Sequence, residues 1–130
     1  MTTLSIVLFS GTEDKLHSAA TLVAGAAAMG RPVNLLLQFW ALDAFRADRI
    51  GQPRGLASDR PGDVRADRPA LPWAETFRMA KELGEVQVRA CSASLEYLGV
   101  DVQDLDPVVD GACGIAAFFA DAEEGPITFI

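Results

Sequence analysis

Short apolar runs alternate along this chain with segments in which apolar residues recur at helical spacing. The first run, Leu4 to Phe9, is nearly unbroken and predicts a strand that is buried on both faces. Apolar positions from Leu16 to Ala27 then repeat every three or four residues, and Gly30 follows as the predicted helix end. Val33 to Trp40 is the next apolar run and predicts a second strand. These three segments predict a right-handed βαβ unit with parallel strands.

The second half of the chain continues the alternation of helical and extended patterns. The patterns predict a short helix over Ala41–Asp48, a helix from Trp73 ended by Gly84, and a helix over Ser92–Leu98 ended by Gly99. A further helix is expected to be entered at Gly111 and to run through Ile115, Phe118 and Phe119. The predicted strands are Glu85–Ala90, a short one at Val108–Val109, and a closing strand over Ile127–Ile130. About five strands with helices between them predict an α/β fold with a mostly parallel sheet.

The segment from Ile50 to Pro72 differs from its surroundings. It holds four of the seven prolines and three glycines, and it has no apolar period. Arginines and aspartates interleave within it, which predicts a self-neutralising loop more than an anion-binding patch. We expect a single domain over residues 1–130 with this Arg/Pro-rich loop inserted. The loop is expected to be mobile or to become ordered by packing on a neighbouring subunit.

Composition narrows the range of partners and compartments. The formal net charge of −7 argues against nucleic acid as a partner, because an acidic chain repels phosphates. The N-terminus lacks the basic start of a signal peptide, and the longest apolar stretch, Ala19 to Met29, is far shorter than a membrane span of about 20 residues. Two cysteines are too few for a disulfide scaffold. We therefore expect a cytoplasmic protein with reduced thiols and no membrane partner.

Functional sites of open parallel sheets form at the carboxyl ends of the strands. That rule selects Ser10–Thr12, Gln38–Trp40, Cys91–Ser94 and Gly111–Gly114. Pocket candidates from the first two segments are Ser10, Gly11, Thr12, Gln38, Phe39 and Trp40. The aromatic residues among them belong to a core more often than to a pocket. No phosphate-binding glycine motif and no metal-ligand cluster is visible, so we expect neither a cofactor nor a metal site.

Cys91 is the sharpest candidate for chemistry. It stands at a predicted strand-to-helix junction and is followed by Ser92 and Ser94. Unpaired N–H groups at a helix start favour a thiolate, which is the form that attacks sulfur. Most free cysteines are nevertheless small buried hydrophobes, and Cys91 could be one. Cys113 lies near another predicted helix start, as a resolving partner for Cys91 or as a packing residue.

Several segments together resemble the DsrE/DsrF-like family, in its peroxiredoxin-like branch linked to sulfur metabolism. The similar segments are Leu4–Phe9 with the Ser-Gly turn after it, the alanine-rich first helix ending Ala-Met-Gly, Gln38-Phe39-Trp40-Ala41-Leu42, Val88 to Leu95 with Leu98-Gly99-Val100, Asp110-Gly111 and Ile127–Ile130. The resemblance implies a flavodoxin-like α/β sandwich that assembles into oligomers, with Cys91 where active members carry a sulfur-accepting cysteine. Ala41 departs from the family's glycine, and Cys113 from a small or β-branched residue.

The resemblance and the position of Cys91 favour a sulfur-relay protein that carries a persulfide on Cys91. Its partners would be sulfur-donor and sulfur-acceptor proteins and further copies of the same chain. Two alternatives remain open at this point. One is a non-catalytic structural or regulatory subunit that merely retains Cys91, and the other is a thiol redox protein that uses Cys91 and Cys113.

Overall fold

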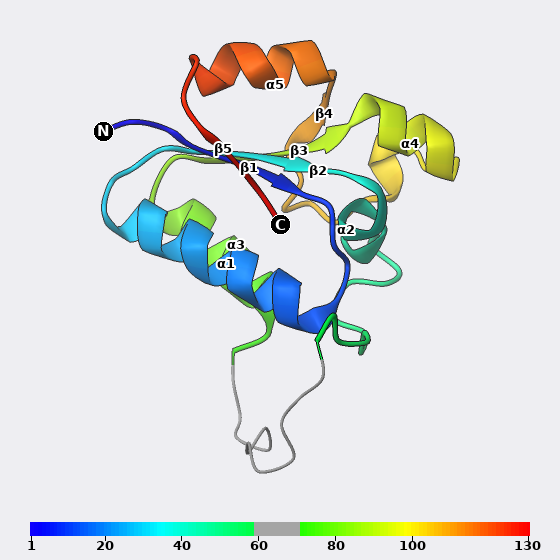
Figure 1. The fold of residues 1–130 in the computed structure, drawn as a ribbon. Helices are drawn as coiled ribbons and strands as arrows, with labels where there is room; N and C mark the ends of the chain where they lie inside the picture. Colours follow the sequence, from blue (N-terminus) through cyan, green and yellow to red (C-terminus); the bar gives the residue numbers. More distant parts are fainter. Residues whose placement is uncertain (59–70) are drawn as a thin grey trace.

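The computed structural model describes residues 1–58 and 71–130, which are built around a five-stranded parallel sheet (Figure 1). Its strands are β1 (Leu4–Leu8), β2 (Val33–Leu37), β3 (Val86–Cys91), β4 (Gly111–Cys113) and β5 (Ile127–Phe129). They lie in the order β4-β3-β2-β1-β5, and every neighbouring pair is parallel. The predicted α/β fold with about five strands is confirmed, including the parallel β1–α1–β2 unit.

Helices cover both faces of this sheet. They are α1 (Glu13–Ala28), α2 (Phe39–Ala44), α3 (Trp73–Leu83), α4 (Ser92–Leu98) and α5 (Ile115–Ala122), with a short 3₁₀ turn at Val102–Asp104. Helices α1 and α3 lie on one face and α5 on the other, which confirms the expected three-layer, flavodoxin-like sandwich (Figure 1). In flavodoxin itself β1 lies between β2 and β3, whereas here it lies between β2 and β5. None of the described helices is long and apolar enough to span a bilayer.

The face under α1 and α3 carries most of the core. Alternate strand residues point into it, and all are almost fully buried: Ile6, Leu8, Leu35, Leu37, Val88 and Ala90. Helix α1 buries its alanine-rich side there, as its spacing predicts. Its small side chains permit close packing, because a Cβ added at Gly84 would lie 2.9 Å from the carbonyl oxygen of Ala27. Trp73, Phe77 and Ala80 of α3 also point into this core.

The face under α5 has a smaller core. Val7, Leu36, Cys91 and Phe118 form its buried cluster, with Cys113 packed against them. On β3, Gln87 is exposed and Arg89 is half-buried, so this face of the sheet is only partly covered. Both faces of a parallel sheet are normally covered. The α5 side of this sheet is therefore the less complete layer.

The predicted strand Val33–Trp40 is too long. The strand ends at Leu37, and Phe39 and Trp40 form the first turn of α2, so the helix expected over Ala41–Asp48 starts two residues earlier and ends at Ala44. Phe39 turns the chain with a φ of 42°, in the left-handed region. An apolar run does not reveal such a turn, because apolar residues fill buried strands and buried helix starts alike.

The predicted strand at Val108–Val109 is wrong. Asp106 begins a turn there, with the Val109 N–H donating to the Asp106 carbonyl at 3.0 Å and the Val108 N–H to the Asp106 carboxylate at 2.9 Å. The strand is instead Gly111–Cys113, which was expected to lead straight into a helix. Valine is β-branched and favours strands, which is why the sequence predicts a strand at these two residues. The backbone N–H groups of both valines are instead hydrogen-bonded within the turn.

The start of the inserted loop packs against α1 and α2. The Glu13 N–H donates to the carbonyl of Gly55 at 2.8 Å, and Arg54 donates to the carbonyl of Gly11. Asp43 pairs with three arginines: Arg46, Arg49 and Arg54. Of the arginines in the predicted loop, Arg54 lies among the described residues, and its partner Asp43 belongs to α2. Most of the expected Ile50–Pro72 insertion, residues 59–70, lies outside the described residues.

Truncation of Phe77 should destabilise the fold strongly. Its ring is fully buried, with centroid distances of 5.3 Å to Phe45 and 6.1 Å to Trp73. We expect Phe77→Ala to lower the free energy of unfolding by about 3–5 kcal/mol. Met79→Ala, on the exposed side of the same helix, should change it by about 0.5 kcal/mol or less. Urea unfolding followed by circular dichroism measures both, and similar losses in the two variants would contradict this packing.

The contact between the loop and α1 should titrate with the Asp14 carboxylate. The N–H groups of Ala57 and Ser58 donate to it at 2.9 and 3.3 Å, and the Ala57 bond is the main cause that lowers the pKa of Asp14 below 3.8. A lowered folded-state pKa means that the contact contributes stability above pH 3.8 and loses it as pH falls further. The Ala57 and Ser58 amide resonances should therefore shift with a midpoint below 3.8, and Asp14→Asn should abolish the transition. A midpoint at or above 3.8 would contradict the contact.

Candidate functional site

The carboxyl ends of the strands bring the predicted site residues to one edge of the sheet. In spatial order, Cys113 ends β4, Cys91 ends β3, Gln38 follows β2, Phe9 follows β1 and Phe129 ends β5. Parallel strands end at a common edge, so residues far apart in sequence become neighbours there. The residues that this rule selected from the sequence therefore lie at one edge of the sheet: Cys91, Gln38 and the segment around Cys113.

Cys91 occupies the junction between β3 and α4. It is the last strand residue and the N-cap of α4, and it is 4% exposed. The side-chain amide of Gln38 points its Nε2 at the Cys91 Sγ from 4.0 Å, so a hydrogen-bond donor faces the sulfur. Ser92 is exposed, whereas Ser94 is buried and its Oγ has no partner among the described residues. The two serines predicted to support Cys91 thus have different surroundings.

Cys113 lies directly beside Cys91. The two residues are register partners on adjacent parallel strands, and both thiols are free. Cys113 is the more exposed of the two. Partial burial raises the pKa of its thiol above the ordinary value, with Cys91 and Asp121 adding to the rise and Arg89 opposing it. The 22 positions that separate the cysteines in sequence concealed this pairing, which depends on the register of β3 and β4.

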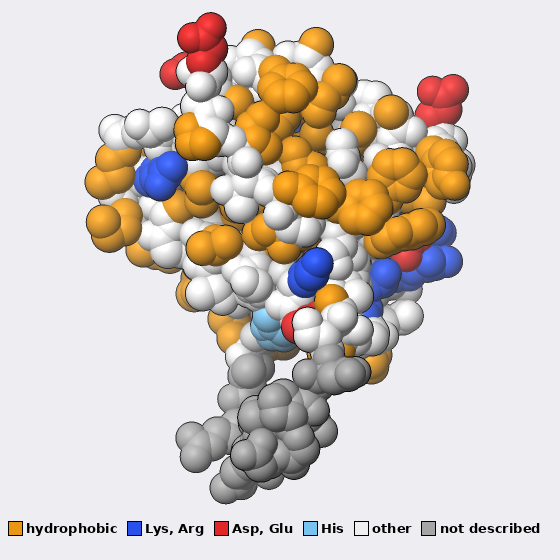
Figure 2. Space-filling model, in the orientation of Figure 1, with side chains coloured by type: hydrophobic (Ala, Val, Ile, Leu, Met, Phe, Trp, Pro, Cys, Tyr) orange, Lys and Arg blue, Asp and Glu red, His pale blue; other side chains and the backbone are white. Residues whose placement is uncertain are grey.

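An arc of aromatic side chains extends along the same edge. Ring centroids are 5.7 Å apart for Phe129 and Phe9, 5.4 Å for Phe9 and Phe39, and 5.1 Å for Phe39 and Tyr97. Trp40 continues the arc at 6.1 Å from Phe39. Trp40, Tyr97 and Phe129 are exposed, so these rings are not the closed core that aromatic residues usually indicate. Figure 2 shows apolar side chains gathered on this face, over α5 and on towards α4 and α2.

Phe39, at the centre of this arc, has a left-handed backbone. A φ of 42° is unusual for a bulky residue and costs about 1–3 kcal/mol. Such conformations persist only where the surroundings impose them, and they cluster at functional sites. Sequence reasoning selected Phe39 and Trp40 but missed Phe9, Tyr97 and Phe129. Phe9 and Phe129 could have been found because each stands at the end of a predicted strand.

Ser10, Gly11 and Thr12 belong to a separate hollow. They line a pocket of about 470 Å³ together with Lys15, Trp40 and Arg54, and Cys91 does not line it. Gly11 is required there, since a Cβ would lie 2.4 Å from the carbonyl oxygen of Trp40. The Ser10 and Thr12 hydroxyls are 2.9 Å apart and satisfy each other. The structure therefore joins this segment to Trp40 but not to the cysteines.

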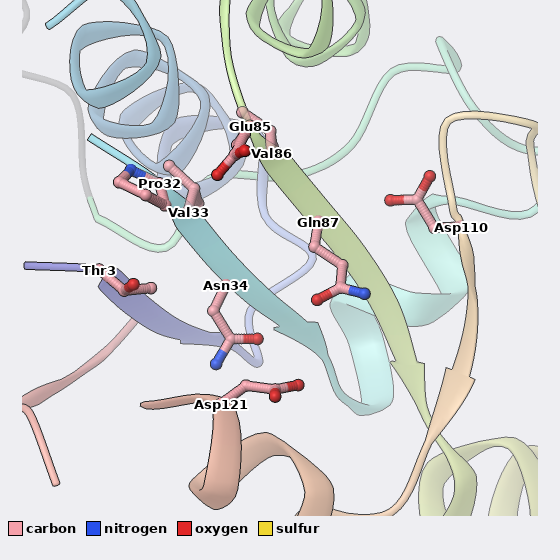
Figure 3. Close-up of a pocket in the computed structure, with 9 residues that line it drawn as sticks. All are labelled: Thr3, Pro32, Val33, Asn34, Glu85, Val86, Gln87, Asp110 and Asp121. Atoms are coloured by element: carbon pink, nitrogen blue, oxygen red, sulfur yellow. The ribbon is translucent and has the colours of Figure 1, made fainter. Parts of the chain in front are cut away.

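A polar pocket of about 450 Å³ lies at the opposite, amino-terminal end of the strands (Figure 3). In its lining, the buried Asn34 donates to the carbonyl of Phe118 at 3.2 Å and accepts from Arg89 at 2.9 Å. Arg89 also pairs with Asp121 of α5 at 2.7 Å. Buried polar groups must be hydrogen-bonded, and this network supplies the partners that allow the polar side chain of Asn34 to lie within the sheet. The same network attaches α5 to the sheet.

The acidic residues around this polar pocket do not form a metal-binding group. In the part of the chain that the structure describes, no set of three or more His, Cys, Asp or Glu side chains is placed to hold a metal ion. Two carboxylates of the pocket already have cationic partners, since Asp110 pairs with Lys81 and Asp121 with Arg89. The thiols at the other end of the sheet are therefore the groups best suited to covalent chemistry.

Known proteins resemble this chain in sequence and in fold. No protein-family model matches the sequence. The structure is similar over its whole length to MTH1491 from Methanobacterium thermoautotrophicum (TM-score 0.66, 15% identity) and to YchN from E. coli (TM-score 0.62, 16% identity), each matched over 100% of its own chain. At these identities the likeness concerns the fold alone. The sequence is 30% identical to the uncharacterized protein YrkE of Bacillus subtilis, over 95% of this chain and 92% of YrkE. The chain therefore belongs to the same family as YrkE.

Proposed function

We propose that this protein is a sulfur carrier that holds a persulfide on Cys91. The Cys91 thiolate attacks the terminal sulfur of a donor persulfide, R–S–SH. The new bond leaves Cys91–S–SH, and the donor departs as the thiolate R–S⁻. A second protein thiolate then removes the terminal sulfur in the same way and regenerates Cys91. The partners are a sulfur-donor and a sulfur-acceptor protein in the reducing cytoplasm, and no cofactor is required.

The observation that carries this proposal is the position of Cys91 at the carboxyl edge of the sheet. Cys91 is the last residue of β3, and its sulfur faces the Gln38 amide at 4.0 Å. The second free cysteine, Cys113, is its neighbour on the adjacent strand. Sites of parallel α/β proteins form at this edge. The resemblance of the segment around Cys91 to the cysteine motif of the DsrE/DsrF-like family supports the same assignment.

A dithiol redox protein is the second candidate function. The register pairing of Cys91 with Cys113 favours it. In that case peroxide would oxidise Cys91 to a sulfenic acid, and Cys113 would condense with it to a disulfide and release water. Peroxide treatment that yields a Cys91–Cys113 bond, in a protein that takes up no sulfur from a persulfide donor, would favour this function. No reaction with either reagent would indicate a non-catalytic subunit.

Replacing Cys91 with serine should abolish sulfur uptake. Serine is nearly isosteric, but its hydroxyl does not accept a sulfane sulfur, so Cys91→Ser should keep the parent circular dichroism spectrum and gain no sulfur. Glu96→Gln, an exposed change on the same helix, should gain one sulfur atom like the parent protein. Intact-mass spectrometry after treatment with a persulfide donor, with peptide mapping of the added sulfur, measures both variants.

Two results would count against Cys91 as the carrier. One is that Cys91→Ser takes up as much sulfur as the parent protein. The other is that Cys91 reacts with a small alkylating reagent only after denaturation, as a packing cysteine would.

We also propose that the protein assembles into a homo-oligomer through the face made by α5 and β5. Helix α5 is apolar on nearly all sides, yet it buries only Phe118 and Ala122. Ile115 and Phe119 of α5 are 44% and 55% exposed, and Phe129 of β5 is 66% exposed. Contiguous exposed apolar surface of this kind is typical of protein interfaces.

A charge placed on this face should reduce the assembly state. We expect Phe119→Asp to lower the molar mass measured by light scattering at micromolar concentration, because a buried unpaired carboxylate is costly. Leu22→Asp is the matched control, since Leu22 is 46% exposed on α1, on the opposite side of the sheet. It should leave the mass unchanged. A parent protein that is already monomeric would remove the oligomer proposal.

A further inference from the structure

Cys113 is paired with Cys91 across β3 and β4. We propose that Cys113 is a further catalytic residue, whose thiolate attacks the persulfide on Cys91 and releases the carried sulfur as hydrosulfide. This inference rests on the proposed persulfide at Cys91. It adds a discharge route within one chain, beside transfer to an acceptor protein. The product class is inorganic sulfide, and the protein is left with a Cys91–Cys113 disulfide.

The register of the sheet makes the two cysteines direct neighbours on adjacent strands. Cys91 and Cys113 are direct partners in the β3–β4 ladder, and both pack in the small core against Phe118. Adjacent strands lie about 4.8 Å apart, and disulfides join residues whose Cα atoms are about 4.4–6.8 Å apart. A disulfide between these residues therefore needs no large backbone movement.

The step balances without an external oxidant. The Cys113 thiolate attacks Sγ of Cys91, the inner sulfur of Cys91–S–SH. A Cys91–Cys113 bond forms, the bond between Sγ and the outer sulfur breaks, and that outer sulfur leaves as HS⁻ with its electron pair. The two cysteine sulfurs are joined in a disulfide, and the carried sulfur is reduced to sulfide. A dithiol reductant then restores both thiols.

The surroundings of Cys113 control when this step occurs. Partial burial raises the pKa of the Cys113 thiol, Cys91 of β3 and Asp121 of α5 raise it further, and Arg89 of β3 opposes them. The thiol therefore supplies less of the attacking thiolate at a given pH than an ordinary cysteine, which slows the discharge. The rate also depends on the fraction of Cys91–S–SH that is still protonated, because the outer sulfur leaves as HS⁻.

The test follows loaded protein over time. Reduced parent protein, Cys113→Ser and Cys113→Ala are treated with inorganic polysulfide, desalted and incubated without reductant. Intact mass and released hydrosulfide are recorded at several pH values. The parent protein should first gain one sulfur, then lose it as one hydrosulfide per chain and end two hydrogens lighter than the reduced form. Both variants should load sulfur on Cys91 but release hydrosulfide roughly tenfold more slowly.

The outcomes separate this inference from the carrier function. If the variants load sulfur and discharge it as fast as the parent protein, the role of Cys113 is wrong and the carrier function stands. If the parent protein discharges without forming a Cys91–Cys113 disulfide, the role of Cys113 is likewise wrong. If folded Cys113→Ser and Cys113→Ala take up no sulfur on Cys91, the carrier function fails and the role of Cys113 fails with it.

Discussion

Parallel pairing of β2, β3 and β4 is the constraint on which the candidate site depends. The β2–β3 ladder aligns Leu37 with Ala90, and the β3–β4 ladder aligns Cys91 with Cys113. This register places the Gln38 amide and both thiols at one edge, although they come from distant parts of the chain. A shift of one residue in β4 would turn Cys113 to the opposite face of the sheet, away from Cys91.

The two faces of the sheet differ in how completely they are covered. Helices α1 and α3 close one face with a large apolar core, and that face carries most of the buried surface. On the other face, α5 contributes one buried ring, Phe118, and is attached by the polar bridge from Asn34 through Arg89 to Asp121. The thiols lie on this less complete side. The fold thus keeps the two thiols apart from the larger core.

The two cysteines also differ in exposure. Cys91 is almost fully buried, whereas Cys113 is more open to solvent. The aromatic arc lies along the same carboxyl edge of the sheet, and Phe39 within it has a left-handed backbone. In the proposed sulfur transfer, a partner protein would reach the thiols at this edge of the sheet.

The sequence by itself determined the element types, the α/β fold and the position of Cys91 at a strand-to-helix junction. These features follow from local patterns: apolar runs, helical spacing, and the glycines at 30, 84 and 99 that follow helices. Tertiary structure alone decided where β2 ends, since nothing local distinguishes the apolar pair Phe39–Trp40 in a strand from the same pair in a helix. It also decided which residues form β4 and that Cys113 lies beside Cys91. Strand pairing joins segments distant in sequence, so its register arises only when the sheet assembles around its core.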